Sequence, residues 1–512
     1  MFHDRVPEVA LSSIKGAIGH CLGAAGGEEC VASVMALNNG MVPPTVNFDP
    51  DFDPAPFDLV PNKAEKRDCR VILSNSFAFG GNNCCLSLGK PGFTGNAPEP
   101  ADDSVVITGM GAVTPIGNTV NEYWEGLQTG KNGVAPITHF DASGYKASVA
   151  AEVKNFDPSA VIEKREVRHM DLYCQFAMVA AEEAIKQSGL TEGNFDPFRA
   201  GTLMASGIGG IMTLGQEQVK MIDRGPNRVS PFCIPMIIGN MATAHVSMRF
   251  GLKGSSFAPV SACASGTHAV GEGMRAIRHG YLDIAVVGGA EAAIAPIAVA
   301  GFSNMHALSG TEDPEQACCP FDARRNGFIM GEGAGVLVLE SLSHAKARGA
   351  KILAEVAGYG TTSDAYHITS PDPTGEGPMR AMQMAIEDGG LTPADVDYIN
   401  AHGTSTPVND ACETNAIKLA FGEQANNVAI SSTKSMTGHL LGAAGAIEAI
   451  ACALAVQNDK IPPTIHYEQP DEACDLNYVP NQMVEKEVRA AISNSLGFGG
   501  HNATILIKKY TD

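Results

Sequence analysis

A fifteen-residue peptide occurs near both ends of the chain, as SSIKGAIGHCLGAAG at residues 12–26 and as SSTKSMTGHLLGAAG at residues 431–445. The similarity continues without a gap, and 28 of 73 positions are identical between residues 11–83 and 430–502. Chance does not give such agreement at one constant offset, so the chain contains a duplication. Two copies offset by 419 residues do not form a solenoid, because solenoid repeats recur every 20–50 residues or so.

The sequence between the two copies divides the chain. Residues 90–103, KPGFTGNAPEPADD, are rich in Pro, Gly and acidic residues, which is typical of a linker. A β-branched strand follows at residues 105–108. We therefore predict a partial copy at residues 1–90, a linker at residues 91–103 and one continuous unit from residue 104 to the end.

Within the continuous unit, apolar strand-like runs such as VVIT, IAVVGG and GVLVLE alternate with helical patterns, for example at residues 171–188 and 378–388. This alternation predicts an α/β fold with largely buried strands. A hydrophobic content of 44% with only 18% charged residues agrees with a well-buried globular protein.

Composition also restricts the function. The net charge of −21 argues against a non-specific nucleic-acid binder. The longest apolar run, residues 440–456, carries Glu448 at its centre and is short for a membrane span, so we expect a buried helix. No basic leader precedes an apolar core, so we expect no signal peptide. The thirteen cysteines show neither CxxC pairs nor Cys/His ligand spacing, which predicts reduced thiols in a cytoplasmic protein and no metal site.

Cys263 is the first candidate for chemistry, in PVSACASGTHAVGEGMRAIRHG. The thiol precedes a helix-forming stretch, and the N–H groups and dipole at a helix N-terminus favour the thiolate. Its small neighbours leave room for a substrate carbonyl. A cysteine in such a peptide is more often a small buried hydrophobe, so this motif alone does not establish catalysis.

Two further loops support a catalytic role. His402 follows the strand-like VDYIN in NAHGTSTPVNDACET, and His439 stands at the start of an apolar helix, five residues after Lys434. One nucleophilic Cys with two His suits acyl transfer with carbanion chemistry, because two imidazole N–H groups can stabilise an enolate oxygen. Glu448 lies in an otherwise uncharged helix and needs a partner, for which Lys434 is the nearest candidate in sequence.

The unit from residue 104 onward resembles the β-ketoacyl-[acyl-carrier-protein] synthases of the type II condensing class. The resemblance covers the whole unit and rests on the stretches TGMGAVTPIGN, ACASG, GGAEAAIAPIAVAGF, GFIMGEGAGVLVLE, AYHITSPDP, AHGTSTPVND, KSMTGHLLGAAG and NSLGFGGHN. It implies a thiolase-like fold of alternating layers, αβαβα, made of two related halves at residues 104–355 and 356–512. It also implies a homodimer, an acyl carrier protein as partner, and no cofactor other than the carrier's phosphopantetheine.

The resemblance assigns roles to individual residues. Cys263 matches the acylated nucleophile, His402 and His439 the pair that promotes decarboxylation and condensation, Lys434 the lysine of that site and Glu448 its buried structural carboxylate. The backbone N–H groups of Cys263 and Phe498 match the oxyanion hole, and Phe498 matches the gate of the acyl pocket, where flanking glycines allow the loop to move. The residues that match the acyl tunnel are Ile208 and Phe302. Those that match the pantetheine contacts are Thr369, Ser370, Thr404 and Thr406.

Three positions depart from the pattern of the relatives. Asn326 stands where Asp is usual, Leu496 where Phe is common, and His306 where an Arg often contacts the carrier protein. Because carrier proteins are acidic and this chain is acidic too, docking needs a local basic patch. The available basic clusters are Lys164, Arg165 and Arg168, and Arg275 and Arg278.

We therefore predict decarboxylative Claisen condensation of an acyl group on Cys263 with malonyl-acyl carrier protein, in fatty acid chain elongation. A thiolase would need a second catalytic Cys, which the GFGG loop lacks, and a non-catalytic chain-length partner would lack Cys263. Two alternatives stay open: a condensing synthase of polyketide or other secondary metabolism, and a carrier-docking scaffold without turnover.

The first copy corresponds only to the C-terminal portion of such a synthase. It contains no counterpart of Cys263 or His402, so Lys15, His20 and Phe79 cannot complete a site by themselves. We expect the chain to be the tail of a tandem double synthase, or a relic of one, whose two units could pair as a pseudo-dimer. With its apolar helix uncovered, the segment should be less stable than the main unit or use a surface of another part.

Overall fold

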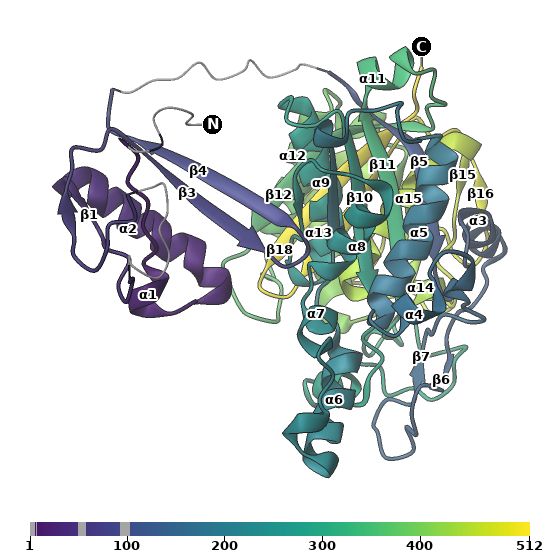
Figure 1. Ribbon diagram of the computed structural model, residues 1–512. Helices are drawn as coiled ribbons and strands as arrows, with labels where there is room; N and C mark the ends of the chain where they lie inside the picture. The colour runs from purple at the N-terminus through teal and green to yellow at the C-terminus, as the bar shows by residue number, and fades with distance from the viewer. Residues whose placement is uncertain (1–5, 7, 50–57, 93–102, 512) are drawn as a thin grey trace. The chain divides into compact units, whose positions relative to one another are not determined.

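The computed structural model describes residues 6, 8–49, 58–92 and 103–511 (Figure 1). Most of the predicted linker, residues 91–103, lies outside the described residues. The chain divides into two compact units, Met1–Pro98 and Glu99–Asp512, which we call unit 1 and unit 2 and describe separately.

Unit 1 is built from one main helix packed on a hairpin. The helix α2 contacts both strands of the antiparallel pair β3–β4, and a shorter pair, β1–β2, follows the helix. Its elements are α1 (Lys15–Ile18), the 3₁₀ turn η2 (Leu22–Ala24), α2 (Ala25–Asn39), β1 (Met41–Val42), β2 (Glu65–Lys66), β3 (Val71–Ala78) and β4 (Asn82–Gly89).

Every element of unit 1 recurs in unit 2 exactly 419 residues later, as the duplicated sequence predicts. The counterparts are α14 (Lys434–Thr437), η9 (Leu441–Ala443), α15 (Ala444–Asn458), β15 (Lys460–Ile461), β16 (Val484–Glu485), β17 (Ala490–Gly497) and β18 (His501–Lys508). The same residue pattern therefore encodes the same local structure in both places.

The main sheet of unit 2 has the strand order β14-β13-β17-β18-β12-β5-β11-β10-β8-β9 and consists of two related halves. In each half three strands are parallel, β10-β8-β9 and β17-β13-β14, and two more are added antiparallel, β11 then β5 and β18 then β12. The remaining strands are β5 (Val105–Val113), β8 (Ala200–Ala205), β9 (Ser256–Phe257), β10 (Ile284–Glu291), β11 (Gly333–Ser341), β12 (Ala354–Ser363), β13 (Tyr398–Asn400) and β14 (Ala429–Ser431).

The halves meet at the first residues of β12, which pair with β5, whereas β12 pairs along its length with β18. The second half thus begins at Ala354, beside the predicted junction between residues 355 and 356. The shorter strands β6 (Ala135–Pro136) and β7 (Val149–Ala150) form a separate pair.

Helices cover both faces of each half-sheet and produce five layers (Figure 1). The outer helices α5 and α8 pack on the first half, α12 and α13 cover the second, and α9 and α15 pack together between the halves. The main helices are α3 (Val120–Thr129), α5 (Leu172–Ser188), α6 (Ile211–Arg224), α8 (Met241–Phe250), α9 (Ser265–Arg278), α10 (Pro296–Asn304), α12 (Glu376–Asp388) and α13 (Pro407–Phe421). The short helices are α4 (Lys164–Val167), α7 (Cys233–Ile237) and α11 (Leu342–Ala347). The fold is thiolase-like, αβαβα, as the resemblance implies.

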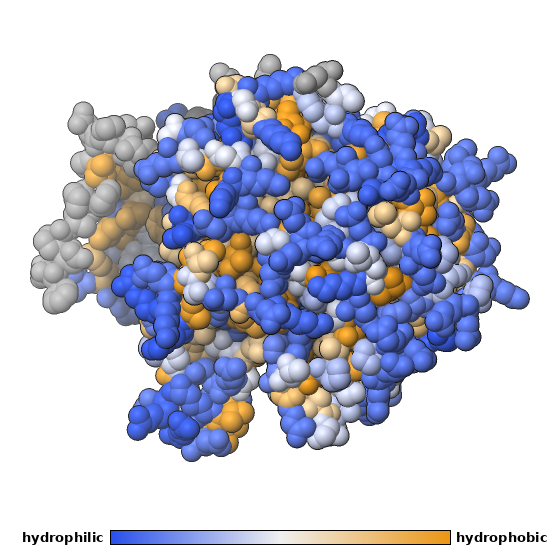
Figure 2. Space-filling view, turned by 90° about the vertical axis from the view of Figure 1, so that its right-hand side faces the viewer, coloured by the Kyte–Doolittle hydropathy of each residue, from blue (hydrophilic) through white to orange (hydrophobic). Residues whose placement is uncertain are grey.

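The position of α15 explains its composition. A helix in the central layer is surrounded by protein, so its whole circumference is apolar. The stretch Leu441–Asn458 is long and apolar enough to cross a membrane, but 89% of it is buried inside the protein, as in the core helix of a globular fold. The face of the protein in Figure 2 is largely hydrophilic, with hydrophobic residues scattered among polar ones.

Candidate active site

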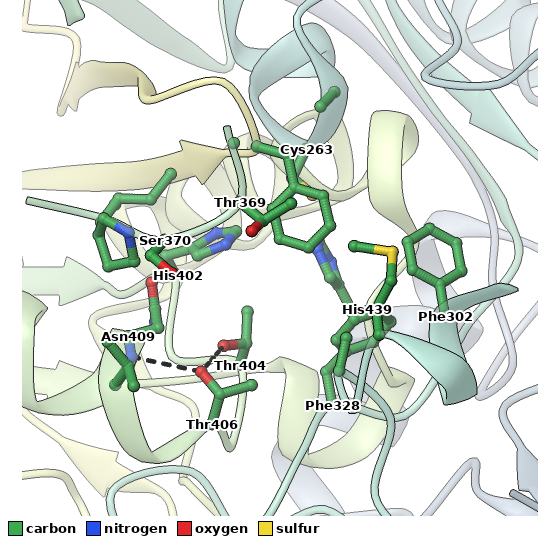
Figure 3. Close-up of a pocket in the computed structure, with 18 of the residues that line it drawn as sticks. Cys263, Phe302, Phe328, Thr369, Ser370, His402, Thr404, Thr406, Asn409 and His439 are labelled. Carbon is green, nitrogen blue, oxygen red and sulfur yellow. Dashed lines mark hydrogen bonds between the residues drawn. The ribbon is translucent and has the colours of Figure 1, made fainter. Parts of the chain in front are cut away.

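Cys263 lies on a sharp turn that leads from β9 into α9. The 3₁₀ turn η6 (Ala262–Ala264) carries it, and Ala262 has a φ of 51°, a left-handed conformation that is uncommon for a residue other than glycine. Two hydrogen bonds hold the turn: Ser261 N–H donates to Ser265 Oγ at 2.8 Å, and Ser265 Oγ donates to the Ala262 carbonyl at 2.6 Å. This turn presents the thiol to the cavity in Figure 3.

The ionisation of the thiol differs from the sequence expectation. Burial raises the pKa of Cys263 to about 12, although Lys434 and the backbone N–H groups of Phe498 and of Cys263 itself lower it. The helix N-terminus was expected to favour the thiolate, and this expectation is wrong for the resting protein, because desolvation of the buried sulfur outweighs the nearby N–H groups. The two N–H groups beside the sulfur are those that the resemblance assigns to an oxyanion hole.

The two histidines converge on the same cavity from separate loops (Figure 3). His402 follows β13, and His439 follows α14; their ring centroids are 5.3 Å apart and the rings are nearly perpendicular, at 88°. Burial first, and then the charge of Lys434, lowers the pKa of both imidazoles well below the usual value. Neutral imidazoles each carry one N–H, so the pair can donate two hydrogen bonds without titrating near neutral pH.

Lys434 and Glu448 lie behind the cavity and do not line it. Their side chains, each 1% exposed, form an ion pair between α14 and α15, the pairing that the sequence indicated. Burial raises the pKa of Glu448 to about 7, whereas Lys434 lowers it. The pair joins the start of the His439 loop to the central helix, and the lysine charge adds to burial in lowering the pKa of both imidazoles.

Phe498 lies in the turn between β17 and β18, where Gly499 and Gly500 both have positive φ. Its ring centroid is 6.4 Å from that of Phe302, which in turn is 5.5 Å from Phe328. Gly497 packs so closely on the Cys263 backbone that an added Cβ would lie 2.7 Å from the Ser261 carbonyl oxygen. A glycine is therefore required where the Phe498 loop crosses the Cys263 turn.

A cavity of about 620 Å³ gathers ten of the twelve residues predicted from the sequence. Cys263, His402, His439 and Phe498 line it together with the tunnel residues Ile208 and Phe302. The predicted pantetheine contacts Thr369, Ser370, Thr404 and Thr406 line it too. Thr404 and Thr406 share a hydrogen bond of 3.0 Å, and Asn409 N–H donates to Thr406 Oγ1 at 3.3 Å (Figure 3).

The three departing residues Asn326, Leu496 and His306 also line the cavity. Asn326 joins two loop residues, accepting from Ser309 Oγ at 2.6 Å and donating to Thr311 Oγ1 at 3.0 Å. In the basic clusters, ion pairs within unit 2 join Arg165 to Glu163, Arg275 to Glu272 and Arg278 to Asp388.

Two buried carboxylates escaped the sequence reasoning. Glu291, at the end of β10, accepts from Ser206 Oγ at 2.8 Å and from the N–H groups of Gly207 at 2.8 Å and Gly442 at 2.9 Å. Glu413 on α13 accepts from the N–H groups of His402 and Gly403, both at 2.8 Å. Glu291 lies in the apolar stretch GGAEAAIA, where the reasoning applied to Glu448 could have found it, whereas Glu413 lies among polar residues in NDACETN.

A Cys and two neutral His at one cavity, with a buried Lys behind it, on two related half-sheets, define a thiolase-like ketosynthase. The family model described as Beta-ketoacyl synthase, N-terminal domain, matches residues 102–345. The model described as Beta-ketoacyl synthase, C-terminal domain, matches residues 1–49 and 353–468, so it recognises both copies of the repeat. The chain belongs to the β-ketoacyl synthase family.

Relatives and solved structures agree with this assignment. The chain is 51% identical over 407 residues to "3-oxoacyl-[acyl-carrier-protein] synthase 2" of a Synechocystis species and 52% identical over 406 residues to that of Staphylococcus aureus. Each match covers 79% of this chain and 98% of the relative. A type II polyketide ketosynthase in complex with its acyl-carrier protein superimposes with a TM-score of 0.75 at 36% identity, covering 81% of this chain and all of that one. A β-ketoacyl synthase of Burkholderia phymatum gives 0.75 at 34% identity, covering 80% of this chain and all of that one.

Proposed function

We propose that the protein condenses an acyl group with malonyl-acyl carrier protein to give 3-oxoacyl-acyl carrier protein and CO₂, in fatty acid chain elongation. The observation that carries the proposal is the arrangement of Cys263, His402 and His439 around one cavity, with two backbone N–H groups beside the sulfur. The identity of 51–52% to the 3-oxoacyl synthases, against 36% to the polyketide ketosynthase, favours fatty acid elongation.

In the first stage the Cys263 sulfur attacks the thioester carbonyl of an acyl carrier protein. The thiol gives up its proton, the C–S bond to the phosphopantetheine breaks, and the carrier leaves as its thiol. The N–H groups of Cys263 and Phe498 stabilise the oxyanion of the tetrahedral intermediate. The acyl chain then enters the apolar part of the cavity past Ile208 and Phe302.

In the second stage malonyl-acyl carrier protein enters, held by Thr369, Ser370, Thr404 and Thr406 along its pantetheine arm. The malonyl C–C bond breaks and releases CO₂, while the N–H groups of His402 and His439 stabilise the enolate oxygen. The enolate carbon attacks the acyl-enzyme carbonyl, and the C–S bond to Cys263 breaks. These steps need only a nucleophile and hydrogen-bond donors, so we propose no cofactor other than the carrier's phosphopantetheine.

The same reasoning extends to assembly and location. The edge strand β9 carries Phe257, which is exposed, and Val260 just after it is exposed too, so we propose that unit 2 forms a homodimer through this edge. The exposed basic helix α4 is a suitable place for an acidic carrier protein. Free thiols at all thirteen cysteines, every one in the described residues, support a cytoplasmic location.

The test of the function combines intact mass and product formation. With acyl carrier protein carrying an acyl group, the wild type should gain one acyl mass, and Cys263→Ala should gain none. Cys233→Ala, at a partly exposed thiol outside the cavity, is the matched control and should be acylated normally.

His439→Ala separates the two stages: it should keep acylation but lose condensation by about 10²-fold or more, because one enolate hydrogen bond is lost. Labelling of another cysteine, or normal condensation by His439→Ala, would contradict the assignment. A panel of acyl-carrier proteins with acyl and polyketide chains then distinguishes elongation from secondary metabolism. Binding of carriers without any product would instead support a docking scaffold.

A further inference from the structure

Unit 1 has the same elements as residues 434–508 of unit 2 but exposes surfaces that those residues bury. Leu22 is 77% exposed, whereas its counterpart Leu441 is 3% exposed. Val31 on α2 is 60% exposed, whereas Ile450 on α15 is fully buried. On the hairpin, Phe77 is 76% exposed, whereas Leu496 is 8% exposed. Large apolar residues on a helix and on a sheet face thus have no cover within unit 1, which marks an interaction surface.

Unit 2 shows what covers these surfaces. α15 packs against α9 and β11, and its apolar residues belong to the large core between the half-sheets. The opposite face of the hairpin β17–β18 packs against α12, where Ile492 and Leu506 share a core with Met382 and Ile386. The body of unit 2, residues 104–428, therefore provides the surface on which its own C-terminal segment packs.

The open strand edges of the hairpin in unit 1 also indicate that a body like residues 104–428 covers it. β17 pairs in parallel with β13, and β18 pairs antiparallel with β12. Within the described residues of unit 1, β3 and β4 pair only with each other, so both outer edges of the hairpin lack a strand. Open strand edges beside uncovered apolar residues are templates for a further strand.

The backbone angles and the ion pair of unit 1 also match those of the C-terminal segment of unit 2. Leu22 and Leu441 share a left-handed backbone, with φ of 51° and 47°, and Val60 and Val479 both have φ of 46°. Lys15 forms an ion pair with Glu29, as Lys434 does with Glu448. The clearest mismatch on the buried helix face is Glu28, which stands where unit 2 has the fully buried Ile447.

We propose that unit 1 docks into a second β-ketoacyl synthase body, one equivalent to residues 104–428 that has no other C-terminal segment bound to it. In that complex β3 pairs with the counterpart of β13, β4 pairs with the counterpart of β12, and α2 packs on the counterpart of α9. Lys15, His20 and Phe79 then take the places that Lys434, His439 and Phe498 have in unit 2. The partner's own Cys and first His would complete a second site.

The binding test uses the full chain with Cys263→Ala, co-expressed with a tagged body fragment, residues 104–428 of the same sequence, as the probe. We expect the fragment to be soluble and to co-purify with the full chain. The matched control is the Cys263→Ala chain without residues 1–92, which should leave the fragment insoluble. Glu28→Ile in the full chain should increase the recovery, because it restores the apolar residue at the mismatch.

Equal recovery with and without residues 1–92, or no recovery with either, overturns the proposal. This readout does not depend on catalysis, so it is independent of the proposed function.

Activity gives a second readout, which does rest on the proposed function. The fragment has Cys263 and His402 but no Lys434 or His439, and the Cys263→Ala chain has no nucleophile, so neither condenses alone. The co-purified complex should condense, and adding His20→Ala to the full chain should abolish this while the two polypeptides still co-purify. Condensation that survives His20→Ala would mean that residues 429–512 of the full chain had exchanged into the fragment, and would overturn the proposal.

Discussion

At the scale of single residues, the site combines a protonated thiol with two neutral imidazoles. Burial is the first cause of all three pKa shifts, upward for Cys263 and downward for His402 and His439. A neutral site suits the proposed chemistry, because the imidazoles need their N–H groups and a charged imidazolium would be costly in a dry cavity.

The lowered histidine pKa values predict a dependence of stability on pH. As pH falls below about 6.5, the unfolded chain binds a proton at His439 and the folded protein does not, so folding loses up to about 1.4 kcal/mol per pH unit from this residue. In His439→Gln this loss is absent. The free energy of unfolding of the wild type relative to His439→Gln should therefore fall between pH 6.5 and 5, and stay constant from pH 7 to 8, in denaturant titrations.

Equal pH slopes for the two proteins would contradict the burial of a neutral His439.

We expect Glu291 to act as a positioning residue for the proposed acyl pocket. Its carboxylate ties the loop before Ile208 to Gly442, at the turn that follows His439. Glu291→Gln turns an NH₂ group toward N–H donors, so we expect a loss of about 1–3 kcal/mol in stability and a changed dependence of acylation on acyl chain length.

The matched control for Glu291 is Glu340→Gln. Glu340 is also a buried strand carboxylate, but its partners Arg348 and His344 do not line the cavity, whereas the Glu291 partner Gly207 does. This variant should lose stability and keep the wild-type chain-length profile, measured as kcat/KM over a series of acyl chains. An unchanged profile in Glu291→Gln would show that its role is only structural.

At the scale of elements, the duplicated helix pair offers an internal comparison. Lys434 and Glu448 join α14 to α15 with both side chains 1% exposed, whereas Lys15 and Glu29 join α1 to α2 with 36% and 17% exposure. Removing one partner of a buried pair strands the other charge, which costs about 3–5 kcal/mol, but partly exposed pairs contribute about 0–1 kcal/mol.

Glu448→Ala should therefore lower the melting temperature strongly and reduce condensation, while Glu29→Ala should change little. Thermal unfolding of both variants measures the difference. An unchanged melting temperature in Glu448→Ala would indicate that the Lys434 charge finds another partner or water.

At the scale of the whole molecule, the two units differ in completeness. Unit 2 contains a cavity with all the residues that the proposed reaction needs, and unit 1 supplies only counterparts of Lys434, His439 and Phe498. We expect a chain without residues 1–103 to fold, dimerise and condense like the full chain. Calorimetry of the full chain should show an additional transition at lower temperature, which the shortened chain lacks. Loss of activity in a shortened chain that still folds would mean that unit 1 contributes to this site.

The sequence by itself determined the duplication, the α/β class and most of the candidate site. SSTKSMTGHLLGAAG and its copy align without a gap, which can be read from the sequence alone. The helices and strands of the two copies then begin and end at residues that differ by 419 in every case. Cys263, His402 and His439 could be found because each lies in a loop of small residues whose composition is itself unusual. Roles for residues such as Thr369 and Ser370 came only from the family resemblance, since Thr and Ser in loops ordinarily satisfy turns.

Only the tertiary structure decided the properties that depend on burial. The helix N-terminus beside Cys263 is visible in the sequence and favours a thiolate, but desolvation by distant segments reverses the shift of its pKa. Glu291 became recognisable only when the fold brought Ser206, Gly207 and Gly442 around it from two other segments. Homologous peptides with the same local structure are buried in unit 2 and exposed in unit 1, because burial is set by what packs against an element. That information lies outside the peptide itself.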